Sequence, residues 1–82
     1  MKEKYFVVEV EEMAVTEVEE FDELESAVNY YKKLTSEADI ADGGFEDDFE
    51  AFVEGLNNTC TFLYINKYGT KHSITILAKR IN

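Results

Sequence analysis

The chain of 82 residues has no proline, no tryptophan, one cysteine and one histidine. The single cysteine, Cys60, excludes an internal disulfide and argues against a small secreted scaffold. Without proline-rich linkers, repeats or low-complexity segments there is no sign of a second domain, so residues 1–82 are expected to form one domain. Six Phe and five Tyr residues supply the large side chains that so small a core requires.

Long hydrophobic runs are also lacking. The longest, Tyr5–Val8 and Phe62–Ile65, have four residues, whereas a helix needs roughly 20 to span a bilayer. The opening residues Met1-Lys2-Glu3-Lys4 lead directly into a strand-like segment without the apolar core of a signal peptide. We therefore expect a protein that does not enter membranes and is cytoplasmic, in a bacterial host cell if the phage-type interpretation given below holds.

Acidic residues are absent after Glu54, and this asymmetry dominates the charge pattern. The net charge is −10, with 17 of the 18 acids in residues 9–54 beside only Lys32 and Lys33, whereas residues 55–82 carry four bases. Such a charge favours solubility, destabilises the fold by self-repulsion and disfavours contact with nucleic acid or anionic membrane. The electrostatic complement of this chain is a basic partner.

The first twenty residues predict one strand and leave a second open. Residues 4–12 alternate so that Phe6, Val8 and Val10 share one face, while Tyr5 and Val7 share the other with acidic residues. Residues 15–20 are too short and too mixed to assign. They form either a second strand paired with the first or a connection without regular structure.

Two helices are predicted in the middle of the chain. The first starts at Asp22, where Asp22 and Glu25 fit a capping box, and is broken between Thr35 and Gly44. Its apolar stripe comprises Leu24, Ala27, Val28, Tyr31, Leu34 and Ala38. The second is expected from about Phe45 to Leu56, with Phe45, Phe49, Phe52, Val53 and Leu56 on one side.

The last third predicts a β-hairpin, residues 59–66 and 70–81, joined by Lys67-Tyr68-Gly69 with Gly69 in the left-handed conformation. The best register pairs Tyr64 with His72, Phe62 with Ile74 and Cys60 with Ile76 toward the helices, and Leu63 with Ser73 and Thr61 with Thr75 on the other face. The expected fold is α+β, a three- to four-stranded antiparallel sheet with two helices on one face, in the order strand, possible strand, helix, helix, strand, strand. In that order the first strand runs antiparallel to the first hairpin strand.

Nothing in the sequence predicts catalysis, a cofactor or a metal. Cys60 and His72 share a hairpin face without being opposite, and no nucleotide-binding or hydrolase motif occurs. A calcium loop starting at Asp39 fails because Ala41 and Gly43 occupy ligand positions. The hairpin tip, with Lys67, Tyr68, Lys71 and His72, has too little charge to predict direct nucleic-acid binding and is interpreted as a solvated turn.

The acidic surface is the main candidate for binding. Its predicted residues are Asp39, Asp42, Glu46, Asp47, Asp48, Glu50 and Glu54, extended by Glu17, Glu19, Glu20 and Glu23. So many acids with so few bases leave little relief from repulsion, which is easier to understand if the carboxylates face a positive surface. Phe45 or Tyr30 would be the aromatic anchor.

Size, acidity, the expected α+β fold and carboxylates such as Glu46-Asp47-Asp48 beside an aromatic helix face resemble the small acidic inhibitors of bacteriophages and mobile elements, including anti-CRISPR and DNA-mimic anti-restriction proteins. This resemblance of overall character implies an inhibitor that fills the basic nucleic-acid-binding groove of a CRISPR effector or a restriction-type protein. The alternative is a protein-interaction module, such as a homodimer, that uses the sheet face with Leu63 and Ile65.

Overall fold

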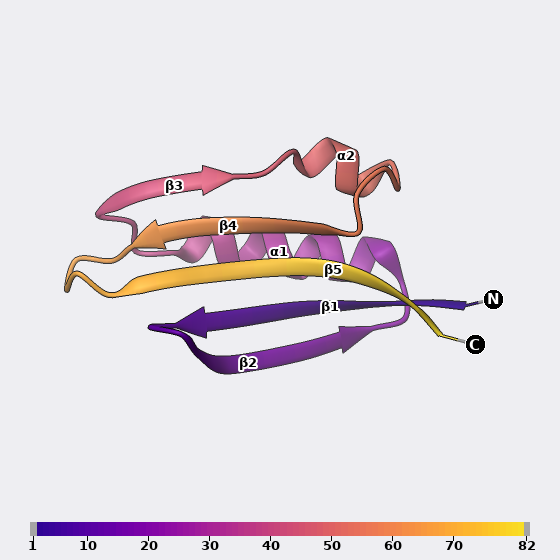
Figure 1. Ribbon diagram of the computed structural model, residues 1–82, viewed down its shortest axis with the longest axis horizontal. Helices are drawn as coiled ribbons and strands as arrows, with labels where there is room; N and C mark the ends of the chain where they lie inside the picture. Colours follow the sequence, from indigo (N-terminus) through magenta and orange to yellow (C-terminus); the bar gives the residue numbers. More distant parts are fainter. Residues whose placement is uncertain (1, 82) are drawn as a thin grey trace.

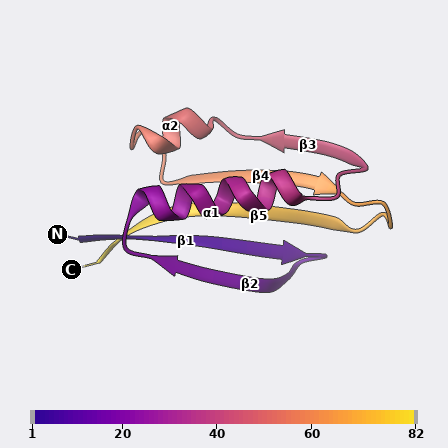
Figure 2. The same ribbon diagram turned by 180° about the vertical axis from the view of Figure 1, so that it is seen from behind.

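Five antiparallel strands, in the spatial order β2-β1-β5-β4-β3, form the body of the computed structural model, which describes residues 2–81. The elements are β1 Lys2–Glu11, β2 Ala14–Phe21, α1 Leu24–Glu37, β3 Asp42–Glu46, α2 Phe49–Val53, β4 Thr59–Ile65 and β5 Lys71–Ile81. Helix α1 lies behind the sheet in Figure 1 and in front of it in Figure 2. The sheet therefore has a helix-covered face and a second face, here called the outer face, over which no described helix lies.

The C-terminal hairpin has the predicted register. Phe62 is opposite Ile74, Cys60 opposite Ile76, and Tyr64 opposite His72. The turn is closed by a hydrogen bond from the Gly69 amide to the Asn66 carbonyl (3.0 Å). Gly69 has φ +80°, a conformation that a residue with a Cβ adopts only at a cost. Both the three-residue loop and the role of Gly69 are confirmed.

The hydrophobic core lies between α1 and the inner face of the sheet, as predicted. Its buried residues are Val7, Ala27, Tyr31, Phe52, Cys60, Phe62, Ile74 and Ile76. Residues directly opposite one another in neighbouring strands share a face, so the pairing of Val7 with Ile76 and of Ile76 with Cys60 aligns three strands under the helix. The Phe62 face of the hairpin thus points toward the helices.

The strand count is higher than predicted, although the α+β class is correct. Residues 14–21 form β2, which settles the open question about residues 15–20 in favour of a strand. Residues 42–46 form β3 instead of belonging to the loop and the second helix. Gly43 and Gly44 have φ of +88° and +86° and create a bulge against β4, after which Phe45 pairs with Leu63. Consequently α2 begins only at Phe49 and ends at Val53.

The predicted direction of the first strand is wrong for the same reason. Strand β1 lies beside β5 and is antiparallel to it, so it runs in the same direction as β4. Strand β2 adds one reversal to the path of the chain, whereas β3 and α2 follow one another in the same direction and together occupy the single leg expected for the second helix (Figure 1). Strand β1 pairs with β5, which is the central strand of the sheet.

The predicted capping box of the first helix is also wrong. Glu23 is the N-cap of α1 and its side chain makes no capping hydrogen bond. The Asp22 carboxylate instead contacts the Lys4 ammonium at 3.2 Å, and Lys4 also contacts Glu20 at 2.7 Å. A cation from β1 therefore draws Asp22 away from the helix end. The helix itself is confirmed, with Ala27 and Tyr31 fully buried.

Candidate functional surfaces

Cys60 and His72 do not meet. Cys60 is 0% exposed and its sulfur lies 3.6 Å from the Tyr31 hydroxyl. Burial raises the pKa of the Cys60 thiol, which keeps it protonated and weakly nucleophilic. Because Cys60 faces Ile76, and His72 lies four residues before Ile76 on β5, the two are separated by about 13 Å along the strand. The structure forms no Cys–His pair.

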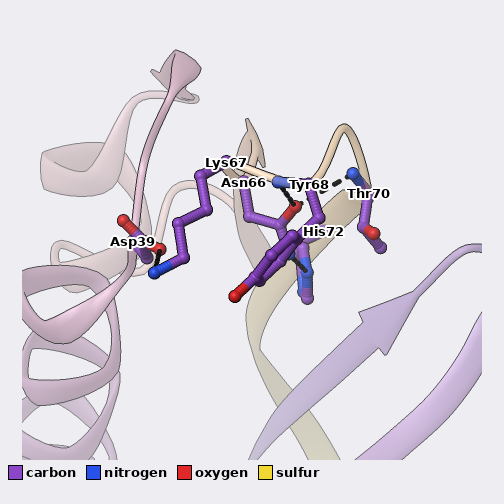
Figure 3. Close-up of polar contacts among 6 residues, drawn as sticks. All are labelled: Asp39, Asn66, Lys67, Tyr68, Thr70 and His72. Atoms are coloured by element: carbon purple, nitrogen blue, oxygen red, sulfur yellow. Dashed lines mark hydrogen bonds and ion pairs between the residues drawn. The ribbon is translucent and has the colours of Figure 1, made fainter.

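Polar groups at the tip of the β4–β5 hairpin build the turn (Figure 3). The Asn66 carboxamide oxygen accepts hydrogen bonds from the Tyr68 amide (2.9 Å) and the Thr70 amide (3.0 Å). Its NH₂ group is left to donate to His72 Nε2 at 2.9 Å, so this nitrogen carries no proton in this arrangement. Lys67 pairs with Asp39 at 3.6 Å. Asn66, Lys67 and His72 therefore make contacts within the protein itself.

The predicted acidic residues are divided between opposite edges of the sheet. Asp42, Glu46, Asp47, Asp48, Glu50 and Glu54 lie on β3, on α2 and next to them; we call this set the β3–α2 acidic edge. Glu17, Glu19, Glu20 and Glu23 lie on or just after β2; we call this set the β2 acidic edge. Strands are spaced about 4.8 Å apart, so the outermost of five are about 19 Å apart. For Glu17, Glu19 and Glu20 the prediction that they extend the first set is wrong (Figure 1). Glu23 precedes Leu24, which lines a depression together with Glu54.

On the β3–α2 acidic edge, neutral groups hold the carboxylates. The donors are the Tyr31 hydroxyl to Glu46 (2.7 Å), the Thr61 amide to Asp47 (3.4 Å), the Ala51 amide to Asp48 (3.1 Å) and the Gly43 amide to Asp42 (2.9 Å). All six residues of this edge are exposed. Within residues 2–81 none of them is ion-paired, whereas Asp39 is paired with Lys67. Four of the six carboxylates are thus held by neutral donors, and Lys32 of α1 lines a depression together with the other two, Glu50 and Glu54.

The β1–β2 hairpin brings further acids together. Glu17 lies directly opposite Glu9 on the helix-covered side, and Glu19 lies opposite Val7. The pKa of Glu9 is raised by partial burial and by the negative charge of Glu17. The alternation of Glu9 and Glu11 with Val8 and Val10 places both acids on this side, but only the pairing of β2 shows that Glu17 faces Glu9. Sequence reasoning missed Glu9 for this reason.

The two proposed aromatic anchors lie in different places. Tyr30 belongs to the β1–β2 side of the molecule. Burial and the negative charges of the nearby Glu17 and Glu19 raise the pKa of its hydroxyl. Its ring also packs on Phe21, with ring centroids 5.4 Å apart. Phe45 is 74% exposed and points to the outer face beside Leu63. No single acidic surface therefore contains both rings.

The outer face of the sheet carries hydrophobic residues on all five strands, interspersed with polar ones. By the strand register, its hydrophobic residues are Phe6, Val8, Val10, Val15, Val18, Phe45, Leu63, Ile65 and Leu77. Leu63 is 53% exposed. Exposed hydrophobic residues that group into a large patch mark an interaction surface. A shallow depression of about 270 Å³ opens beside Phe45, Leu63 and Ile65. The predicted placement of Leu63 and Ile65 away from the core is confirmed.

Two further findings concern the described residues only. Between residues 2 and 81 no helix combines the length and apolar character needed to cross a membrane. In the same range no three His, Cys, Asp or Glu side chains are grouped closely enough to hold a metal ion.

Comparison with known proteins yields no match to a family model, to a curated protein or to a solved structure.

Proposed function

We propose that this protein is a macromolecular inhibitor that occupies the basic nucleic-acid-binding groove of a nucleic-acid-processing protein, of the CRISPR-effector or restriction type. The observation that carries the proposal is the β3–α2 acidic edge, in which exposed carboxylates are ordered by neutral donors and lack ion pairs among the described residues. Its carboxylates would take the place of phosphate groups. The protein would act by occupying a site, without chemistry of its own.

The way these carboxylates are held supports binding to a cation. A hydrogen bond from an amide or hydroxyl fixes a carboxylate in position while leaving its negative charge in place. Glu46 and Asp48 are held in this manner. Side chains that are ordered before binding lose less rotamer freedom on association, so more of the electrostatic attraction appears as affinity. A negative edge also speeds encounter with a basic groove and makes binding weaken as salt rises.

The second acidic edge supports the proposal in a different way. The opposed pair Glu9 and Glu17 destabilises the sheet, because like charges directly across a strand pair repel. A basic partner would relieve this repulsion. With acids on both edges, the molecule can present negative charge to both walls of a groove.

The experiment neutralises charge without removing hydrogen-bond acceptors. One double variant is Asp42→Asn with Glu46→Gln, and another is Glu50→Gln with Glu54→Gln. The amide oxygen of Asn or Gln can still accept the bonds from Gly43 and Tyr31, so folding should survive. The matched control, Glu25→Gln with Glu37→Gln, removes the same charge from exposed positions of α1.

Inhibition is measured as competition with DNA for a panel of basic nucleic-acid-processing proteins, including an RNA-guided nuclease loaded with its guide and a restriction enzyme, at low and moderate salt. The wild type and the α1 control should inhibit a member of the panel, and each edge double variant should weaken inhibition at least about tenfold. Full potency of both edge variants would refute the role of this edge.

A further inference from the structure

We infer that the outer face of the sheet is the interface of a homodimer, in which two copies of this chain pack sheet against sheet with their helices outside. This inference is independent of the proposed inhibitor function. It concerns the outer-face residues defined above, from Phe6 on β1 to Leu77 on β5. Its basis is the apolar character, the charge distribution and the size of this face.

The charge distribution selects a second copy as the occupant. Glu9, Glu17 and Glu19 point to the helix-covered side, away from the outer face. Glu20 points to the outer face, but Lys4 neutralises it at 2.7 Å. By register the face also carries Lys2 on β1, Lys71 and Lys79 toward the two ends of β5, and Asp42 on β3, so it is slightly positive and its charges are peripheral. Two copies of a chain with net charge −10 can meet here without bringing carboxylates together, whereas a basic protein would find few carboxylates to bind.

Two polar side chains at the middle of the outer face are hydrogen-bonded to each other. The Thr61 and Thr75 hydroxyls, from neighbouring strands β4 and β5, are hydrogen-bonded at 2.9 Å. A hydroxyl that already has a partner costs less to bury than one that has lost a water molecule without replacement. The centre of the face is therefore suited to contact with another apolar surface, and the ends of the strands carry the charged residues.

The size of the face is adequate. Four strands with about seven residues each in the central part, and β3 with five, spaced about 4.8 Å apart, cover on the order of 540 Å² per copy in projection. Side chains that interdigitate add further accessible area. Stable interfaces bury about 800 Å² per partner. Two packed sheets with strands nearly aligned and about 10 Å apart would reach this scale.

The shape of the face indicates how the copies are related. The exposed residues Val15 and Val18 project from β2, and the depression beside Phe45 and Leu63 lies at the opposite edge. Figure 1 shows the β1–β2 and β4–β5 turns at the same end of the sheet. A two-fold axis that lies between the two sheets and runs parallel to the strands places β2 of one copy opposite β3 of the other. The turns of both copies then lie at the same end. The valines of each copy would then enter the depression of its partner.

The test is the mass in solution, measured by sedimentation equilibrium at low and high salt. The wild type should have twice the 9.4 kDa of the single chain at ~100 μM, and high salt should preserve the dimer because the contact is apolar and repulsion between the copies is screened. Leu63→Lys should weaken dimerisation by about a hundredfold, since two ammonium groups would be buried at the interface.

The matched control is Leu56→Lys. Leu56 is 74% exposed, lies just after α2, outside the sheet, and should leave the dimer intact. Val18→Lys tests the arrangement at the edge of the face and should also dissociate the dimer. A wild type that remains at 9.4 kDa at this concentration at both salt levels would overturn the inference, as would equal masses for Leu63→Lys and Leu56→Lys. Glu50→Gln with Glu54→Gln should leave the mass unchanged, which separates this test from that of inhibition.

Discussion

The two terminal hairpins of the sheet are built from opposite sequence chemistry. The β4–β5 hairpin has a glycine at its left-handed turn position and pairs hydrophobic residues across its strands, as in Phe62 with Ile74. The β1–β2 hairpin turns through Glu12 and Met13, which have φ of +49° and +74°. It also sets Glu9 against Glu17. One hairpin follows local preferences, and the other opposes them.

This difference indicates where the fold is determined. Two-residue turns with positive φ at both positions normally use Asn or Gly, because a Cβ is unfavourable there. Met13 is 97% exposed and gains no packing in return. The β1–β2 hairpin is therefore formed by its pairing with β5, with Val7 against Ile76, more than by its own turn. Conflicts between local preference and fold concentrate at functional or strained sites, which agrees with a binding role for its acids.

The largest expected difference in stability comes from removing one hydrophobic side chain from each hairpin. Phe62→Ala should destabilise the protein by about 3–5 kcal/mol, because it leaves a cavity beneath α1. Val18→Ala, on the exposed side of β2, should cost only about 0.5 kcal/mol. Urea unfolding followed by circular dichroism, at concentrations where the oligomeric state is unchanged, measures both. Equal losses would show that the Val18 side chain is packed as closely as that of Phe62.

Exchanging the turn residues should change stability with opposite sign. Gly69→Ala should cost about 1 kcal/mol, since its Cβ would meet no neighbour and only the backbone conformation is penalised. Met13→Gly should stabilise by up to about 1 kcal/mol for the same reason. Thermal unfolding of the two variants, with the wild type as reference, provides the measurement. Loss of stability in Met13→Gly would mean that its side chain makes a contact in solution.

The smallest effect concerns the opposed carboxylates. The pKa of Glu9 is raised in the folded state, so its ionised form is less favourable there than in the unfolded chain. This penalty is complete above the folded-state pKa and disappears as the pH falls to the unfolded value of about 4.3. Glu9→Gln should therefore stabilise by roughly 0.5 kcal/mol at neutral pH, with the gain lost in acid.

Glu25→Gln is the control for this change. Glu25 lies in the first turn of α1, where the helix dipole favours a negative charge, so its neutralisation should not stabilise. Unfolding free energies from pH 4 to pH 8 distinguish the two variants (a range set by the unfolded Glu value of about 4.3). A gain for Glu9→Gln that stays constant over this range would exclude repulsion as its cause.

The sequence predicted what local chemistry determines. The Asn66–Thr70 turn, the register of Phe62 and the stripe of α1 all follow from residues near one another in the chain. Strand β3 was missed because Phe45 fits the helical spacing of Phe49 and Phe52, and only pairing with β4 decides otherwise. The capping box failed because Lys4, eighteen positions before Asp22, attracts that carboxylate.

The candidate surface was predicted by composition but not by arrangement. Most of its acids are exposed as expected, yet strand order separates Glu17 from Glu46 across the width of the sheet. The number of carboxylates is a property of the sequence, and their grouping depends on which strands are neighbours. The hydrogen bond from Tyr31 to Glu46 likewise joins α1 to β3 across a loop that no local pattern describes.

The two outermost strands differ in how they discourage further strand addition. Strand β3 has five residues and a glycine bulge, which leaves little regular backbone for another chain to join. Strand β2 is longer but carries Glu17, Glu19 and Glu20, so an identical strand alongside it would be repelled. Addition of further strands is therefore disfavoured at both edges of the sheet, so the sheet does not grow into ribbons or fibres. Any self-assembly of this chain is directed toward closed, finite complexes.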